Sequence, residues 1–168
     1  MNAKIPNYKI VRQIGAGGMG AVYEAVHEQI QRRAAIKVLQ ASVAGDQEMV
    51  QRFLNEARAV NIVSHPSLVS IFEFGQASDG SPYIVMEYLE GETLRQRLTR
   101  VGKMKPAQAI NLARQMASAL GAAHAKGIIH RDLKPVMFQP RRKWAAVPQA
   151  GGDLGEMKTN MNMKMRSI

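Results

Sequence analysis

Short runs of alternating apolar and polar residues fill the first half of the chain, and this alternation is typical of β-strands with one buried face. Turn-forming residues separate the runs, such as the Ser-Asp-Gly-Ser segment at residues 78–81. Residues 41–46 are expected to form a loop. The pattern predicts five strands, at residues 8–13, 22–26, 34–39, 68–75 and 82–89.

Residues 47–62 show a helical period instead. Apolar side chains recur there three or four positions apart, at Met49, Phe53, Ala57 and Val60. Glu56 lies on this apolar stripe. Because a buried carboxylate without a partner is costly, we expect Glu56 to pair with Lys37 in the third strand. The alternative is that Glu56 lies at the edge of the stripe, in water.

After residue 89 the pattern becomes helical, and we place the boundary between two lobes there. A short helix is predicted at residues 93–99, with Thr93 as its N-cap. A long helix is predicted at residues 106–126, and Gly127 suits the position just past its end. The inner face of the long helix is expected to carry Ile110, Ala113, Ala117, Leu120 and His124.

No convincing periodicity follows Pro135. Basic residues cluster at positions 141–143, and methionines crowd the end of the chain. We therefore expect residues 136–168 to be a divergent, basic, Met-rich and poorly ordered tail.

The composition narrows the class of protein. The 168 residues are 46% hydrophobic and 21% charged, as in a globular protein with a real core. The absence of cysteine excludes disulfides and thiolate metal sites, and no apolar run is long enough to span a membrane. The scattered histidines lack metal-site spacing. Without a signal-peptide pattern, a cytoplasmic location is expected.

The net charge of +10 could serve a nucleic acid or an anionic membrane surface. However, aromatic residues are few and are not interleaved with the basic ones, as a stacking platform for nucleic acid would require. We therefore expect a basic face and a basic tail, with no nucleic-acid partner.

The most informative motif is a G-x-G-x-x-G run at Gly15, Gly17 and Gly20. Backbone without a Cβ can approach phosphate oxygens closely, but the run alone is a weak signal because dinucleotide-binding folds carry a similar one. Those folds continue directly into a helix. Here a strand-like segment follows, and then a second strand that contains Lys37. This order favours the phosphate loop of a protein kinase.

Five motifs in order, ending with His-Arg-Asp-Leu-Lys-Pro at residues 130–135, resemble those of the eukaryotic-like (Hanks-type) serine/threonine protein kinases. The glycine loop is most similar to that of bacterial members. The resemblance implies an α+β, protein-kinase-like fold. A complete five-stranded antiparallel N-lobe with one helix would span residues 8–89, and an incomplete, mainly helical C-lobe would span residues 90–135.

By resemblance, the cofactors would be ATP and Mg²⁺, and the glycine loop would cover the ATP phosphates. Lys37, held by Glu56, would pair with the α- and β-phosphates. Backbone groups of Glu87 and Leu89 would read the adenine edge, beside Met86 as gatekeeper. The alternative for Lys37 is a lysine that faces solvent. The alternative for residues 83–89 is an ordinary edge strand. The side chains that would sandwich the adenine are Ile14, Val22 and Ala35.

The resemblance also implies the catalytic residues. Asp132 would accept or orient the proton of a serine or threonine hydroxyl on a protein substrate, and Lys134 would neutralise the transferred phosphate. His130 corresponds to a structural histidine of the family, so we expect no catalytic role for it. The oligomeric state stays open.

The resemblance fails where metal ligands should be. Met137 stands five residues after Asp132, where the family has a metal-binding asparagine, and Mg²⁺ requires oxygen ligands. A small deletion is one interpretation. Asp153 is a candidate metal ligand in a degenerate D-F-G motif, or belongs to a coincidental D-x-G in a loop.

No A-P-E motif follows, so we interpret the chain as a kinase truncated or frame-shifted after residue 135. Three hypotheses remain: a serine/threonine kinase with impaired activity, a nucleotide-binding pseudokinase or regulatory module, and a non-functional gene fragment.

Overall fold

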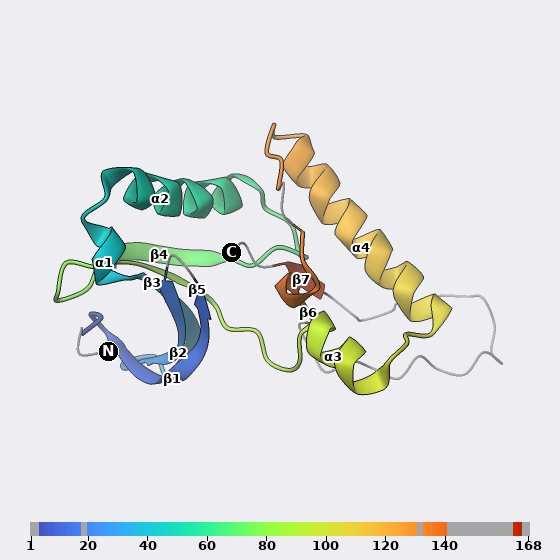
Figure 1. Ribbon diagram of the computed structural model, residues 1–168, viewed down its shortest axis with the longest axis horizontal. Coiled ribbons are helices and arrows are strands. Elements are labelled where there is room, and N and C mark those ends of the chain that lie inside the picture. Colours follow the sequence, from blue (N-terminus) through green and yellow to red (C-terminus); the bar gives the residue numbers. More distant parts are fainter. Residues whose placement is uncertain (1–3, 18–19, 131–132, 141–162, 166–168) are drawn as a thin grey trace. The chain divides into compact units, whose positions relative to one another are not determined.

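The computed structural model describes residues 4–17, 20–130, 133–140 and 163–165 (Figure 1). The chain divides into two compact units. The first unit comprises Met1–Ile62 and Val69–Tyr88, and the second comprises Val63–Leu68 and Leu89–Ile168.

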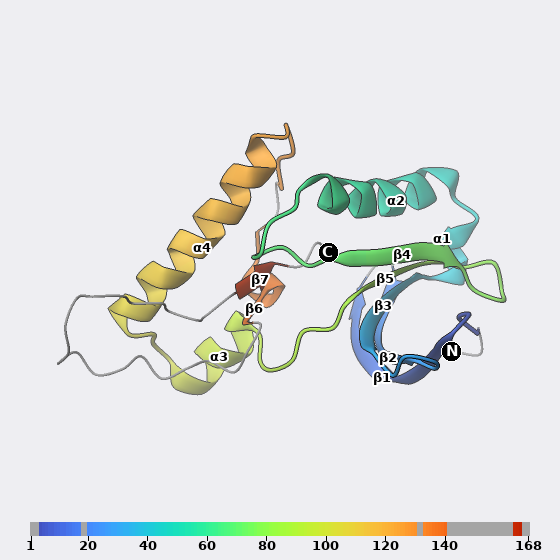
Figure 2. The same cartoon turned by 180° about the vertical axis from the view of Figure 1, so that it is seen from behind.

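The first unit contains one antiparallel sheet with strand order β1-β2-β3-β5-β4 (Figures 1 and 2). The predicted α+β fold with a five-stranded antiparallel sheet is confirmed. The alternation located every strand, although β1 extends four residues beyond its predicted end and β4 begins three residues late. The bounds are Tyr8–Gly17 for β1, Gly20–His27 for β2, Arg33–Leu39 for β3, Ile71–Gln76 for β4 and Pro82–Glu87 for β5.

Two helices accompany this sheet, whereas the sequence predicted one. The extra helix is α1 (Ala41–Ala44), a single turn where we expected a loop. The predicted helix is α2 (Gln47–Ile62), with the expected bounds. Asp46 precedes α2, and its Oδ1 accepts hydrogen bonds from the backbone N–H groups of residues 48 and 49, at 2.9 and 3.3 Å. These bonds satisfy donors that a helix N-terminus leaves without partners.

The two faces of the sheet carry different side chains because side chains alternate along each strand. One face forms a core of small and β-branched residues: Ala25, Ala34, Ile36, Val38 and Val85. The other face contributes Leu39 and Ile84 to a second core, where they pack with Phe53 and Ala57 of α2. Figure 1 shows α2 lying along this part of the sheet.

The third glycine of the motif has a structural role at the start of β2. A Cβ built on Gly20 would overlap the carbonyl oxygen of Val38 in β3. A Cβ on Gly17 would meet no described atom within 4 Å. Of Gly17 and Gly20, only Gly20 is therefore required by the packing of the strands.

The second unit is mainly helical. Its helices are α3 (Leu94–Val101) and α4 (Pro106–His124), followed by the short 3₁₀ turn η1 (Pro135–Met137) and the paired strands β6 (Phe138–Pro140) and β7 (Met163–Met165). The predicted N-cap is confirmed: Thr93 and Gln96 form a reciprocal capping box at the start of α3. Gly127 has a positive φ of 74°, as expected just beyond the end of α4.

Our predicted inner face of α4 is correct only for Leu120, which packs against the core of the second unit, and is wrong for its other four residues, which are exposed. The buried residues are Gln108, Leu112, Ala119 and Ala123, whereas Ile110 is 69% exposed. The helix is rich in alanine, so its apolar residues fit two different stripes. The packed stripe is the one on which Leu112 and Ala119 meet Leu94, Met137 and Phe138.

The predicted tail also needs correction where it is described. Met137 and Phe138 are 1% and 3% exposed and belong to the core of the second unit. Poor order from residue 136 is therefore wrong for these two residues, because their apolar side chains fill space between α3 and α4. Residues 141–162 lie outside the described part of the chain.

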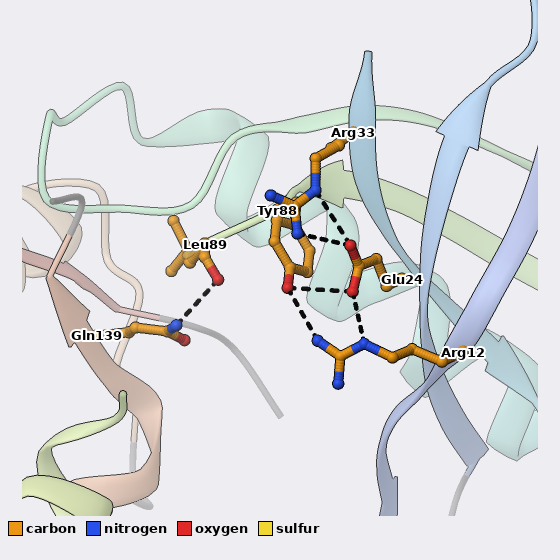
Figure 3. Close-up of polar contacts among 6 residues, drawn as sticks. All are labelled: Arg12, Glu24, Arg33, Tyr88, Leu89 and Gln139. Atoms are coloured by element: carbon orange, nitrogen blue, oxygen red, sulfur yellow. Dashed lines mark hydrogen bonds and ion pairs between the residues drawn. The ribbon is translucent and has the colours of Figure 1, made fainter. Parts of the chain in front are cut away.

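Two polar contacts join distant segments inside the second unit. The Nε2 of His65 lies 3.0 Å from the Oγ of Ser118 in α4, and its Nδ1 accepts the N–H of Ser67 at 3.0 Å. The buried Gln139 donates its Nε2 to the carbonyls of Leu89 and Gly91, at 2.9 and 2.7 Å (Figure 3 shows the bond to Leu89).

We expect Gly20→Ala to lower the free energy of unfolding of the first unit by about 1–3 kcal/mol, because the added methyl group forces β2 away from β3. Gly17→Ala should leave it unchanged or raise it by about 0.4–1 kcal/mol. Urea unfolding followed by circular dichroism measures both. Equal effects of the two substitutions would contradict this assignment.

Candidate functional site

Strand register brings three candidate residues into one row. Gly15 of β1 pairs with Val22 of β2, and Val22 pairs with Lys37 of β3. Lys37 pairs in turn with Ile84 of β5. Directly paired residues of an antiparallel sheet share a face. Since Ile84 packs against α2, this row lies on the face that α2 covers.

A second row lies two residues along the same face. Glu24 pairs with Ala35, and Ala35 pairs with Met86. Ala35 is 3% exposed, whereas Val22, Lys37 and Met86 are half-buried. Apart from Glu24, the side chains of the two rows form a patch of small and apolar groups that includes the cation of Lys37.

Ile14 adjoins this patch at an irregularity of β1. Gln13 pairs with Tyr23 and Gly15 pairs with Val22, so Ile14 is the extra residue of a bulge. Bulges redirect side chains and strengthen the local twist of a strand. Ile14 itself is half-buried.

The Lys37 ammonium is directed toward α2, because its Nζ lies 5.4 Å from the centroid of the Phe53 ring. This distance is within the range of a cation–π contact. Glu56 follows Phe53 by three residues in α2, but its side chain lies outside the described structure. The pairing of Lys37 with Glu56 therefore stays a prediction.

Glu87 and Leu89 lie on opposite sides of the boundary between the units. Glu87 ends β5, pairs with Ala34 and donates its N–H to the carbonyl of Ser70 at 2.9 Å. Leu89 is the first residue of the longer segment of the second unit, and its carbonyl accepts the hydrogen bond from Gln139. Their joint role in reading a base stays a prediction.

Asp132 and Asp153 lie outside the described residues, so their catalytic and metal roles stay predictions. Lys134 is exposed, and its backbone N–H donates to the sulfur of Met137 at 3.3 Å. In return, the Met137 N–H donates to the Lys134 carbonyl at 3.0 Å. The Met137 side chain thus closes a turn and points into the core.

The described residues do not fit a magnesium site. Within the ranges that the structure describes, no group of three or more histidine, cysteine, aspartate or glutamate residues could hold a metal ion. Met137 offers a buried thioether, which is not a ligand for a hard cation. We therefore assign no chemical step to magnesium in this chain.

Sequence reasoning missed a buried carboxylate beside the patch, at Glu24 in β2 (Figure 3). Its side chain is 7% exposed, and both of its oxygens are bonded. Oε1 accepts from Nη2 and Nε of Arg33, at 2.6 and 3.1 Å. Oε2 accepts from Nε of Arg12 at 2.9 Å and from the hydroxyl of Tyr88 at 3.2 Å.

We call Arg12, Glu24, Arg33 and Tyr88 the Glu24 cluster. Within this cluster, Tyr88 also contacts both arginines. The Nη2 of Arg12 lies 3.4 Å from the Tyr88 hydroxyl. The Cζ of Arg33 lies 4.2 Å from the centroid of the Tyr88 ring. The signal for this cluster was Glu24 on the buried face, where a carboxylate needs a partner.

The cluster sets the charge state of Glu24. Burial alone raises the pKa of its carboxyl group, but the hydrogen bond and charge of Arg33, the Tyr88 hydroxyl and the charge of Arg12 outweigh burial. The net effect is a pKa below the ordinary value for glutamate. Glu24 is therefore an anion at neutral pH, although it is buried.

Comparison with protein families agrees with this geometry. Residues 8–140 match the family model described as "Protein kinase domain". The match includes the patch, the Glu24 cluster and Met137. In the described part of the chain, no helix is long and apolar enough to cross a membrane.

Curated bacterial proteins resemble the chain closely. The serine/threonine-protein kinase pkn3 of Myxococcus xanthus is 40% identical over 137 residues, which cover 80% of this chain and 25% of that protein. The serine/threonine-protein kinase PrkC of Bacillus subtilis is 44% identical over 128 residues, which cover 76% of this chain and 20% of that protein. The chain thus spans about a quarter or less of these two relatives.

A solved structure shows the same fold. The PknI kinase domain of Mycobacterium tuberculosis superposes with a TM-score of 0.69 and 25% sequence identity. The superposition covers 98% of this chain and 60% of that one.

The depressed pKa of Glu24 predicts a specific loss of stability in acid. A carboxyl group whose pKa is lower in the folded state stabilises the fold above its unfolded pKa, and this contribution disappears as the pH falls through the folded pKa. We expect the wild type to lose more free energy of unfolding than Glu24→Gln between about pH 5 and pH 2. Urea unfolding at a series of pH values measures this difference.

The matched control is Glu48→Gln, which removes an exposed carboxylate paired with Arg52 on α2. Its stability should follow the wild type at every pH, since exposed pairs contribute little. Parallel pH profiles for the wild type and Glu24→Gln would contradict the prediction.

Proposed function

The chain belongs to the protein kinase family, and we propose that its first unit binds ATP on the sheet face that α2 covers. The observation that carries this proposal is the row formed by Gly15, Val22 and Lys37. In this row a glycine, an apolar side chain and a cation are neighbours. A cation beside closely approaching backbone N–H groups suits phosphate oxygens, and apolar side chains suit a purine ring.

The two rows have separate tasks in this proposal. The triphosphate lies against Gly15, Gly17 and Lys37, where the ammonium neutralises oxygen charge and Glu56 holds the lysine. The base lies against the neighbouring apolar row. Its contacts are the side chains of Ile14, Val22, Ala35 and Met86 and the backbone of Glu87 and Leu89.

We propose that the chemistry of the chain is phosphoryl transfer to serine or threonine hydroxyls of proteins. Asp132 orients the hydroxyl, and Lys134 neutralises the transferred group. Positioning and charge neutralisation are most of what such a reaction needs from a protein. The family uses ATP with Mg²⁺ in general, so the buried thioether of Met137 predicts weak transfer by this chain.

A nucleotide-binding regulatory module is the second candidate, and Met137 is the observation that favours it. The patch with Lys37 supports binding, while a buried methionine in place of an oxygen ligand does not support turnover. For both candidates we propose a cytoplasmic location, where ATP is available, and no nucleic-acid partner, because aromatic residues are few among the basic ones.

Lys37→Met tests the ATP site, because it removes the charge at nearly constant volume. We expect ATP affinity to fall about tenfold to a hundredfold, as for the loss of a charge-assisted hydrogen bond. Isothermal titration calorimetry measures the affinity. The control is Lys9→Met, which removes an exposed lysine from β1 and should bind ATP like the wild type. Unchanged affinity in Lys37→Met would refute the proposed site.

Transfer is tested with radiolabelled ATP and a generic basic acceptor protein, with Mg²⁺ and then with Mn²⁺. We expect rates lower by about 10²–10³-fold than those of a complete kinase domain, as for the loss of one preorganised electrostatic contact. The same assay on Asp132→Asn gives the background. Rapid transfer that disappears in Asp132→Asn would show that Met137 does not impair the chemistry.

A further inference from the structure

The backbone ladder of the sheet stops just before Tyr88. In the described pairings, β5 is bonded to β3 and β4, and its last paired residue is Glu87. Tyr88 follows as the last residue of the first unit. The end of β5 is therefore held by the side chain of Tyr88 rather than by strand pairing at that position.

That side chain connects β5 to three strands at once. Tyr88 donates its hydroxyl to Glu24 of β2, accepts from Arg12 of β1 and lies under the guanidinium of Arg33 of β3 (Figure 3). Neither β1 nor β2 is a neighbour of β5 in the sheet. The Glu24 cluster thus fixes the end of β5 against strands that backbone bonds do not connect to it.

The cluster lies at the base end of the proposed site. Glu24 belongs to the row of Ala35 and Met86, whereas Lys37 belongs to the row of Gly15. A carboxylate is unsuited to contact phosphate, and both oxygens of Glu24 are already bonded. Any influence of Glu24 on a nucleotide must therefore act through Tyr88 and the backbone beside it.

We propose that Glu24 and Tyr88 are positioning residues for base recognition: the carboxylate holds the tyrosine hydroxyl, and the tyrosine holds the Glu87 backbone in the conformation that receives the purine. This inference rests on the ATP site proposed above. It assigns the cluster to selection among nucleotides, whereas the Lys37 row binds the triphosphate that all of them share.

The experiment compares the affinities of ATP, GTP and inorganic triphosphate in the full chain. Tyr88→Phe removes only the hydroxyl and leaves the ring and both ion pairs in place. We expect roughly three- to tenfold weaker ATP binding, with a smaller ratio of ATP to GTP affinity. This loss is smaller than for a direct charged contact, because the hydroxyl acts on the nucleotide only through the backbone of Glu87. Triphosphate affinity should not change. Glu24→Gln should show the same pattern, with a larger loss for ATP.

Two control variants separate positioning from general destabilisation. Arg52→Gln breaks the exposed pair with Glu48 on α2 and should change none of the three affinities. Lys37→Met should weaken ATP, GTP and triphosphate alike. Thermal unfolding of each variant shows whether a loss of affinity results from a loss of stability rather than from a changed contact with the ligand. If Glu24→Gln does not fold, the affinities of Tyr88→Phe alone still test the inference.

The outcomes distinguish the two proposals. No binding of ATP by the wild type overturns the ATP site, and the inference with it. Binding by the wild type together with an unchanged ratio of ATP to GTP affinity in Tyr88→Phe overturns the inference alone. An equal loss for ATP and triphosphate in Tyr88→Phe also overturns it, because the cluster would then only stabilise the sheet.

Discussion

The register between β2 and β3 is the constraint on which the rest of the first unit depends. Val22 pairs with Lys37 in this register. If β3 slipped by a single residue, all of its side chains would move to the opposite face of the sheet. Lys37 would then enter the core formed by Ala25 and Val85, where its ammonium would be buried among aliphatic groups. The cost of that burial fixes the register, and the close packing of Gly20 against Val38 reinforces it.

The Glu24 cluster shows what a buried charge contributes to such a sheet. Removing a carboxylate from water is expensive, and the attraction of its partners repays the cost only if every oxygen is bonded. Glu24 meets this condition, with Arg33 on one oxygen and Arg12 and Tyr88 on the other. An apolar side chain of similar size could be equally stable there. The specific gain from the carboxylate is the direction it imposes on Tyr88.

Sequence patterns located most of the fold because local rules and tertiary packing agree there. Strand alternation placed the sheet, and the capping signal at Thr93 placed the start of α3. The inner face of α4 was misjudged because an alanine-rich helix presents two apolar stripes, and only the contacts of Leu112 select one of them. Met137 was assigned to a tail because its burial depends on residues far away in the sequence, such as Leu94 in α3 and Leu112 in α4.

The candidate site was accessible to sequence reasoning only in part. The glycine motif and Lys37 have a characteristic order along the chain, so they could be identified without coordinates. The Glu24 cluster has no such signature, because its members come from positions 12, 24, 33 and 88 and meet only through sheet register. Patterns that lie close together in sequence are readable, whereas contacts created by pairing are not.

The Gln139 amide has a consequence for the order in which the chain folds during synthesis. All segments of the first unit have been synthesised once Tyr88 is made, so its sheet can close early. The carbonyls of Leu89 and Gly91 must wait for an amide about 50 residues further along. Contacts of such long sequence separation form late. We therefore expect the second unit to close only after β6 has been made, later than the sheet of the first unit.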